Sequence, residues 1–416
     1  MKRIVILGGG IAGLNCLARL SRDNEVTVLE KENEPGGLLR TFRSGGFLFD
    51  RTGHLLHSMN PSLSSFTEHY GIELKKTVRN AAVYIENKYI PYPVQLNIRH
   101  LSPRLRNEVI DQILKSQPEP FSENTDFDTW VKKRFGDGLY ENFFKPYNEK
   151  LYRMPLSRIK ASYFSKYLPA PDKLEMIASL KTGGAGAGYN AEFRYPAAGG
   201  IQAIIDNFAK AYGENIRTGI KVSAVDISKK ILHADGEKIG FDALITTIPF
   251  PEFLLLSGSQ MDLKPAYVNV HDLNLGLNAA EFPFHWAYYP SPEIPFYRIG
   301  SFSNISASLC PPGKQSLYVE TSFSDSPPQS SVVIEALESL GILKASDIIV
   351  RDERMIPYAY PVYDSSYGRI KEFQNSMKNS GVFFFGRSSA WEYLSISEIF
   401  HNARNFCKEV SESIND

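Results

Sequence analysis

The residues with the clearest chemical spacing are three glycines, Gly8, Gly10 and Gly13, in the pattern G-x-G-x-x-G. In this pattern the first glycine allows a tight turn, the second lets backbone approach a pyrophosphate, and the third lets a helix meet a strand closely. Glu30 ends the next strand-like run, where a carboxylate can accept hydrogen bonds from ribose hydroxyls. These four residues predict a dinucleotide site, and the alternative is a glycine-rich turn that binds nothing.

The runs on either side supply the elements that would position this site. Arg3–Leu7 is apolar throughout and predicts a buried parallel strand, Leu14–Leu20 has helical spacing, and Glu25–Glu30 predicts a second strand. In such a βαβ unit the pyrophosphate lies at the helix N-terminus, beside Ile11 and Ala12.

Two further stretches distinguish FAD from NAD. Pro35-Gly36-Gly37-Leu38-Leu39-Arg40-Thr41 follows Glu30, and near the other end a predicted strand at Val382–Phe385 leads through Gly386-Arg387 into a predicted helix at about Ser397–Val410. The chain here resembles the flavoprotein group that includes amine oxidases, protoporphyrinogen oxidase and UDP-galactopyranose mutase. The resemblance implies FAD as the cofactor. For Arg387 alone, a surface salt bridge is the alternative. The implied FAD-binding residues are Gly8, Gly10, Ile11, Ala12, Gly13, Glu30, Lys31, Gly37, Leu38, Arg40, Gly53, Val222, Gly386 and Arg387.

Several stretches, collinear along the chain, resemble the mutase branch of that group. They are Asp50–His57 with its G-H pair, Ile90–Ile98 (P-Y-P-x-Q-x-N), Phe143–Tyr152 (F-x-x-P-Y-N-x-K), Phe193–Gly200, Trp286–Pro290, Phe296–Arg298, Tyr358–Pro361 and Trp391–Tyr393.

This branch interconverts the pyranose and furanose forms of a nucleotide sugar, with reduced flavin N5 as the nucleophile at the anomeric carbon and no net redox change. The resemblance therefore implies a nucleotide-sugar substrate, a UDP-sugar first, and an external reductant such as NAD(P)H. It places Arg298 on the diphosphate and His54 beside the flavin. The full implied set is His54, Arg298, Tyr360 and Tyr393 for catalysis, and Tyr92, Asn148, Tyr152, Tyr297 and Lys166 for substrate binding. Taken singly, the tyrosines are also explained by packing, the histidine by a structural role and the arginine by the surface.

The pattern departs from the branch at two places. Tyr163 stands where the family has a tryptophan, and no arginine follows it, so Lys166 is the nearest cation. Beyond Tyr393, Ser395 and Ser397 offer hydroxyls where mutases carry acidic or amide groups. A different nucleotide sugar, or a relative performing redox chemistry, would account for both.

Charge and composition exclude other classes. The 416 residues carry 46 basic and 46 acidic side chains, which argues against broad binding to nucleic acid. Cys16, Cys310 and Cys407 lack metal-ligand or redox spacing, so we expect no metal site and free thiols. The apolar run after Met1 ends at Gly8, no stretch is long enough for membrane insertion, and the expected location is the cytoplasm. A homo-oligomer is compatible with the sequence.

The predicted fold class is α/β: a Rossmann-like FAD-binding domain with a helical domain and a mixed-sheet substrate domain. We assign residues 1–80, 193–250 and 375–416 to the FAD-binding domain, 101–182 to the helical domain, and 81–100 with 251–370 to the substrate domain. Predicted helices of the second domain are Pro103–Lys115, Asp126–Phe135 and Leu174–Leu180. The loop Gly183–Gly188 is either a lid or a linker.

Two other functions compete with the mutase hypothesis. An FAD-dependent oxidase or desaturase of the amine oxidase or protoporphyrinogen oxidase type would be reduced by its substrate, and it has no need of the P-Y-P-x-Q, P-Y-N-x-K and F-Y-R stretches. A non-catalytic flavin-binding or scaffolding protein is the third hypothesis, suggested by the missing second arginine.

Overall fold

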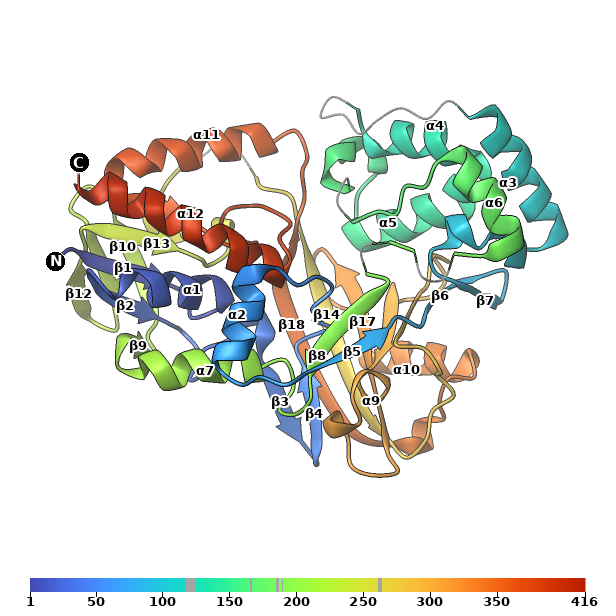
Figure 1. Ribbon diagram of the computed structural model, residues 1–416, viewed down its shortest axis with the longest axis horizontal. Coiled ribbons are helices and arrows are strands. Elements are labelled where there is room, and N and C mark those ends of the chain that lie inside the picture. The colour runs from blue at the N-terminus through green and yellow to red at the C-terminus, as the bar shows by residue number, and fades with distance from the viewer. Residues whose placement is uncertain (117–124, 165–166, 185–186, 189, 261–263, 416) are drawn as a thin grey trace.

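The computed structural model in Figure 1 describes residues 1–116, 125–164, 167–184, 187–188, 190–260 and 264–415. A parallel sheet covered by helices lies at one end of the molecule, a group of helices lies at the other, and a mixed sheet lies between and below them (Figure 1). The predicted α/β fold class, with a Rossmann-like sheet, a mixed sheet and a helical part, is confirmed.

The parallel sheet joins segments that are far apart in the sequence. Its strand order is β19 (Val382–Phe384), β13 (Ala243–Thr246), β1 (Arg3–Leu7), β2 (Glu25–Leu29) and β9 (Ile216–Arg217). Alternate residues of β1 enter different apolar clusters, because successive side chains of a strand point to opposite faces. Ile4 and Ile6 pack toward α1 (Ile11–Leu20), α7 (Ala203–Tyr212) and α12 (Ile396–Asn415), while Val5 and Leu7 pack toward α8 (Phe250–Ser257).

Smaller elements surround this sheet. They are the hairpin β3 (Thr41–Ser44) and β4 (Phe47–Asp50), the pair β5 (Leu74–Val78) and β8 (Glu192–Pro196), the antiparallel sheet β10 (Val222–Asp226), β11 (Ile231–Ala234) and β12 (Glu237–Gly240), and the helices α2 (Pro61–His69) and α11 (Tyr367–Met377). Cys16 on α1 and Cys407 on α12, remote in sequence, lie against each other, and burial raises the pKa of the Cys16 thiol.

The mixed sheet has the order β18 (Ile348–Pro361), β14 (Tyr267–Leu277), β17 (Gln315–Phe323), β16 (Arg298–Ser301), β15 (Trp286–Tyr288), β6 (Ala81–Ile85) and β7 (Lys88–Pro91), with the short helices α9 (Phe302–Ile305) and α10 (Ser330–Ser339) beside it. Its register brings Arg354, Asp272, Glu320 and Arg298 directly opposite one another on four successive strands. Because opposite residues of antiparallel strands share a face, these four ionisable side chains form one row across the sheet.

The helical part contains α3 (Pro103–Lys115), α4 (Phe127–Leu139), α5 (Lys145–Tyr152) and α6 (Lys173–Thr182). Ser102, Asp126 and Asp172 cap α3, α4 and α6 through their side chains. A π-helical turn, Tyr140–Phe144, joins α4 to α5, and Pro146 follows it. Since proline has no N–H to donate to the preceding turn, the regular helical hydrogen-bond pattern is interrupted here.

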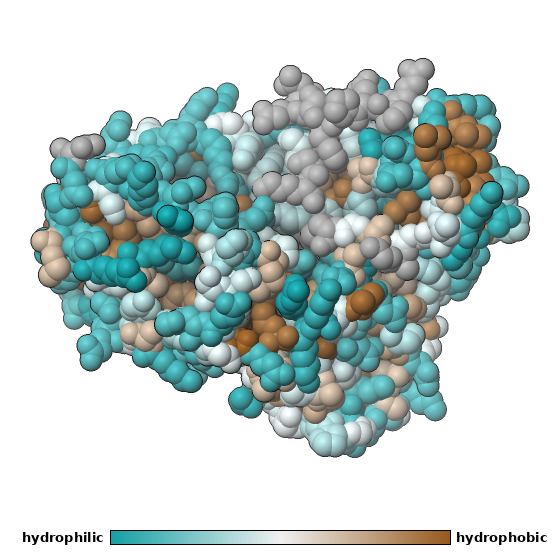
Figure 2. All heavy atoms as spheres, viewed as in Figure 1, coloured by the Kyte–Doolittle hydropathy of each residue, from teal (hydrophilic) through white to brown (hydrophobic). Residues whose placement is uncertain are grey.

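Figure 2 shows apolar side chains gathered over the helical part, where Leu114 and Leu174 are exposed. No helix of the described residues has the length and apolar character needed to cross a membrane.

Lys150 connects α5 to the loop that precedes β16. Its Nζ lies 2.7 Å from the carbonyl oxygen of Tyr289, 2.9 Å from that of Ile294 and 3.2 Å from that of Phe296, and also contacts that of Ser291, so that three N–H donors are shared among four acceptors. A single ammonium therefore gathers four carbonyls of one loop and fixes the entry of the chain into β16.

We predict that Lys150→Met lowers the free energy of unfolding by roughly 2–4 kcal/mol, because each buried carbonyl left without a donor costs about 1–3 kcal/mol and water replaces only part of the lost contacts. Urea unfolding measures the change. Lys145→Met is the matched control on the same helix, since the Lys145 side chain is partly exposed and its ion pair with Glu141 is long, at 3.8 Å. Equal stability of the two variants would show that the contacts of Lys150 with this loop do not stabilise the fold.

Candidate active site

In the turn between β1 and α1, neighbouring atoms lie as close to the glycine backbone as the glycine pattern predicts. Gly8 has φ +98°, and a Cβ there would lie 2.6 Å from Thr247 Oγ1. A Cβ on Gly13 would lie 2.2 Å from the Gly8 carbonyl oxygen, so helix α1 meets the turn with no room for a side chain. At Gly10 the nearest atom to a Cβ would be 3.8 Å away, and the space beside its backbone is open.

The N-terminus of α1 is uncapped. Gly10 offers no side-chain acceptor, and no acidic residue lies in the first turn, so the helix itself supplies no side chain to cap its first amides, those of Ile11 and Ala12 among them. Glu30 follows β2, where its Oε2 accepts from the Gly9 amide at 2.7 Å and its Oε1 accepts from the Glu32 amide at 2.9 Å.

The second glycine stretch lies against this turn. Gly36 donates its amide to the Gly9 carbonyl at 2.8 Å, and a Cβ on Gly37 would lie 3.2 Å from the Gly10 Cα. Leu38 is half-buried in the short turn Gly37–Leu39. Arg40 forms ion pairs with Glu32 and Glu34.

Three other predicted cofactor residues are placed by neighbouring elements. Gly386, after β19, has φ +88°, and its Cβ would lie 2.7 Å from that of Ala12, so this turn covers the start of α1. Val222 begins β10, close to Glu30, whose carbonyl accepts from the Ile220 amide at 2.9 Å. Lys31 points outward and pairs with Glu252 at 2.9 Å.

These observations fit FAD. An open backbone at Gly10, uncapped amides at α1 and a carboxylate after β2 match the needs of a pyrophosphate and a ribose. The turn has the backbone geometry that the glycine pattern predicts, and the assignment of its residues to FAD binding stays a prediction.

The turn Thr52-Gly53-His54 carries the predicted flavin-side residues. A Cβ on Gly53 would lie 2.1 Å from the Tyr318 hydroxyl, so glycine is required there. His54 Nδ1 donates to the Arg51 carbonyl at 2.8 Å, since a carbonyl can only accept. Burial, with the nearby positive charges of Arg387 and Arg298, lowers the pKa of His54 to about 4. The ring is neutral at pH 7, with Nε2 left as an acceptor.

The sequence predicts that Arg298 binds a diphosphate, and in the structure its guanidinium is paired with a carboxylate. Its Nε and Nη2 each donate to a carboxylate oxygen of Glu320 at 2.6 Å, and the Glu320 side chain is fully buried. Burial acts to lower the pKa of Arg298, but the Glu320 charge outweighs it and raises the pKa well above its usual range. The Nε–Nη2 fork is therefore occupied by Glu320, and both hydrogens of Nη1 with the second hydrogen of Nη2 remain as donors for a phosphate.

Arg387 lies over two of the predicted tyrosines. Its guanidinium carbon is 4.0 Å from the centre of the Tyr393 ring and 4.9 Å from that of Tyr360, and these two rings are stacked 6.1 Å apart. The Arg387 Nε is buried without a hydrogen-bond partner among the described residues. Burial raises the pKa of Tyr360 to about 12. The structure thus brings Arg387, Tyr360 and Tyr393 together.

The remaining predicted residues lie around this group or away from it. Tyr152 is buried 6.2 Å from the Tyr360 ring, and the buried Tyr297 adjoins Arg298. Tyr92 packs on Tyr288 at 5.2 Å. Asn148 uses its amide nitrogen inside α5, donating to the Phe144 carbonyl at 2.7 Å. Lys166 lies outside the described residues.

Sequence reasoning missed several residues of this region. Glu320 and Asp272 carry no local motif, and only the sheet register places them beside Arg298. His57 stands in the same stretch as His54, and burial with the charge of Arg298 lowers its pKa to about 4. Tyr147 belongs to the P-Y-N motif and packs edge-on against Tyr288 at 5.3 Å. His57 and Tyr147 both lie in motifs that the sequence analysis singled out, and this position could have indicated them.

Asp272, on β14, is hydrogen-bonded to the turn Thr52-Gly53-His54. Its Oδ2 accepts from the Thr52 amide at 3.1 Å and from Asn274 at 3.2 Å, while Oδ1 is buried without a partner among the described residues. Burial, reinforced by the charge of Glu320, raises the pKa of Asp272 to about 8. The carboxyl is therefore largely protonated at pH 7.

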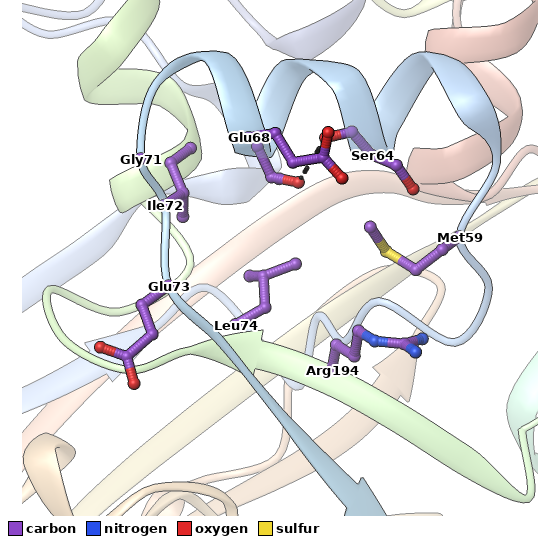
Figure 3. A pocket seen from close by; sticks show the side chains of 9 residues that line it. Met59, Ser64, Glu68, Gly71, Ile72, Glu73, Leu74 and Arg194 are labelled. Carbon is purple, nitrogen blue, oxygen red and sulfur yellow. Dashed lines mark hydrogen bonds between the residues drawn. The ribbon is translucent and has the colours of Figure 1, made fainter.

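A separate recess of about 430 Å³ lies between α2 and the β5–β8 pair. Figure 3 shows Met59 and Arg194 at one end and Glu73 at the other, with Glu68 and Ser64 on the helix above. It has two carboxylates and one guanidinium, a poor match for a diphosphate.

Comparisons with known proteins show the family and the fold of the chain. The family model described as flavin containing amine oxidoreductase matches residues 11–269, so the chain belongs to this family and is an FAD-binding flavoprotein. A crystal structure of reduced UDP-galactopyranose mutase is similar with a TM-score of 0.90 and 24% identity over 99% of this chain and 96% of the other. A putative protoporphyrinogen oxidase from Exiguobacterium sp. 255-15 is similar with a TM-score of 0.76 and 16% identity over 100% and 99% of the chains.

Among curated relatives, coproporphyrinogen III oxidase of Staphylococcus aureus (strain NCTC 8325 / PS 47) is 21% identical over 290 residues, 61% of this chain and 62% of the relative. The 4,4'-diapophytoene desaturase of S. aureus (strain COL) is 29% identical over 99 residues, 24% of this chain and 18% of the relative. The chain thus spans less than two thirds of the length of these relatives.

We predict that Gly10→Val folds but loses FAD. The protein itself leaves room for the side chain, since the nearest atom to a Cβ would be 3.8 Å away, whereas the pyrophosphate path would be blocked. Flavin absorbance per folded protein, judged by circular dichroism, measures the outcome. Gly213→Val, at an exposed position with right-handed helical backbone and nothing near its Cβ, is the control for a β-branched residue at a glycine. A folded Gly10→Val protein with stoichiometric FAD would disprove the assignment.

We also predict that Asp272→Asn flattens the pH dependence of stability. A carboxyl whose pKa is raised from 3.8 to about 8 keeps its proton in the folded state while the unfolded chain loses it. Stability of the wild type therefore falls as pH rises from 5 to 8, by up to about 1.4 kcal/mol per pH unit from this group. Asparagine keeps an acceptor for the Thr52 amide but cannot titrate.

Urea unfolding at several pH values measures this difference, with the exposed Asp111→Asn as control. Parallel pH profiles for wild type and Asp272→Asn would show that Asp272 is already ionised in the folded protein.

Proposed function

We propose that this protein is a flavin-dependent nucleotide-sugar mutase that interconverts pyranose and furanose forms of a UDP-sugar. The observation that carries the proposal is the arrangement around Arg298: one guanidinium held by Glu320, with Tyr297, Tyr360 and Tyr393 in the same group and Arg387 over two of their rings. Cationic and phenolic donors of this kind suit a diphosphate. The backbone likeness to UDP-galactopyranose mutase, at a TM-score of 0.90, supports the same choice.

The flavin supplies the nucleophile in this reaction when it is bound in its reduced form. The residues of this chain have three tasks. Arg298, through Nη1, and the tyrosine hydroxyls stabilise the charge of the departing diphosphate. Neutral His54 presents Nε2 as an acceptor and adds no positive charge. The buried aromatic walls limit the access of water.

The direct experiment gives the protein UDP-galactopyranose under anaerobic conditions with dithionite and separates the ring isomers by chromatography. We expect furanose product with reduced flavin and none with oxidised flavin. Absence of isomerisation with UDP-, GDP- and dTDP-sugars would overturn the proposal.

An FAD-dependent oxidase is the second candidate, favoured by the sequence relation to coproporphyrinogen III oxidase over 61% of the chain. The same protein supplied with coproporphyrinogen III in air would then consume oxygen in proportion to product. A mutase would leave the oxygen concentration unchanged.

We predict that removing Arg298 alone mainly lowers the stability of the protein, so that a second variant is needed to measure its part in binding. Arg298→Met leaves the buried Glu320 charge without a partner, which costs about 3–5 kcal/mol. The double variant Arg298→Met/Glu320→Met removes both charges and should recover most of that stability. It should still bind UDP at least tenfold more weakly than wild type, since a charged hydrogen bond is worth about 1.5–3 kcal/mol.

Titration of the reduced protein with UDP, followed by flavin fluorescence, measures binding, and thermal unfolding measures stability. Arg104→Met, exposed on α3, is the control. Wild-type UDP affinity in the double variant would show that Arg298 does not contact the nucleotide, and Lys166 would be tested next.

A further inference from the structure

A second recess, of about 440 Å³, opens on the helical side of the parallel sheet, among α1, α2, α7 and α12. Figure 1 shows α1, α2 and α12 next to one another there, and contacts of α12 with both other helices join them. Its floor is aromatic. Phe66 is stacked on Phe208, with ring centres 4.7 Å apart, and lies 5.0 Å from Phe400 and 4.8 Å from Tyr70.

The rim of this recess is cationic. Arg19, Arg22, Arg404 and Lys408 line it, and none of the described lining residues is acidic. Arg22, Arg404 and Lys408 are exposed. Lys408 is 3.6 Å from Glu412, a pair in which both side chains are more than half exposed, so solvent screens it and the ammonium remains available to a ligand.

Arg19 is the least exposed of these cations. Its Nη2 reaches the Phe400 carbonyl only at 3.5 Å, and its Nε is buried without a partner among the described residues. An atom that solvent cannot reach is also out of reach of a ligand, so the Nη groups of Arg19, held by the protein only through that long contact, are the ones that can meet an anionic oxygen in the recess.

We propose that this recess is a second nucleotide site, in which the arginines and Lys408 bind the phosphates and the base lies against Phe66 and Tyr70, the half-buried rings of the floor. Guanidinium groups match phosphate oxygens, and aromatic rings offer a flat apolar surface to a base. The volume falls in the range of small-molecule sites. Arg19 is in the last turn of α1, about 13.5 Å of helix rise beyond Gly10, and none of the residues that line the recess belongs to the predicted FAD-binding set.

The same cations would also attract an anionic lipid surface, but the surroundings favour a soluble ligand. The large apolar side chains exposed on the described surface are Met1, Val78, Leu114, Leu174, Leu255, Tyr267, Val332, Ile349 and Met355. None of them lines the recess. A membrane would therefore find no apolar side chain to insert beside these cations.

ATP is the probe, titrated by calorimetry into FAD-loaded protein saturated with UDP so that the proposed substrate site is filled. We expect ATP to bind, and Arg404→Glu/Lys408→Glu to weaken binding at least tenfold with unchanged flavin content. Lys210→Glu, an exposed charge reversal on α7 outside the recess, is the matched control. Inorganic triphosphate, which lacks the base, should bind more weakly than ATP.

No ATP binding, or equal ATP affinity in the double variant and wild type, would overturn the proposal. Binding to phosphatidylglycerol vesicles without ATP binding would also overturn it, because the cations would then serve a membrane. The Arg298 variants should bind ATP normally, so failure of the mutase proposal leaves this test intact.

Discussion

The buried pair between Arg298 and Glu320 is the constraint on which the rest of the candidate site depends. A carboxylate with no solvent exposure is tolerated only when a cation neutralises it with good geometry, and here two hydrogen bonds of 2.6 Å do so. The pair fixes β16 against β17, and the row continues through Asp272, which supports the Thr52 amide on the flavin-side turn. One row of ionisable side chains, with an ion pair at one end and a hydrogen-bonded Asp272 beside it, therefore aligns the sheet and the turn that carries His54.

The charge state of the region follows from burial. His54 and His57 are neutral at pH 7 because desolvation and the nearby arginines disfavour their protonation. Asp272 is kept protonated by the same desolvation and by Glu320. Since Glu320 compensates the charge of Arg298, Arg387 is the cation of this group without an ion pair among the described residues. An anionic ligand would meet Arg387 and the Nη1 side of Arg298 in an otherwise nearly neutral, aromatic environment.

Local patterns predicted the nucleotide turn well, because Gly8, Gly10, Gly13 and Glu30 act within one βαβ unit whose geometry is fixed by short-range contacts. The α/β class and the helices starting at Pro103 and Phe127 were predictable for the same reason, from periodicity and capping residues. Glu320 and Asp272 were not predictable, because their role arises from strand register between distant segments. The occupation of the Arg298 fork is a consequence of that register, and no motif in the sequence reports it.

The most direct test of the account is the number of product molecules formed for each electron pair supplied. The flavin is reduced once, excess reductant is removed, and UDP-galactopyranose is added anaerobically while isomer and flavin absorbance are followed together. The account predicts many turnovers for each reduced flavin, with the reduced spectrum unchanged throughout. Reoxidation of the flavin in proportion to product, or product formation that stops after one turnover, would contradict it.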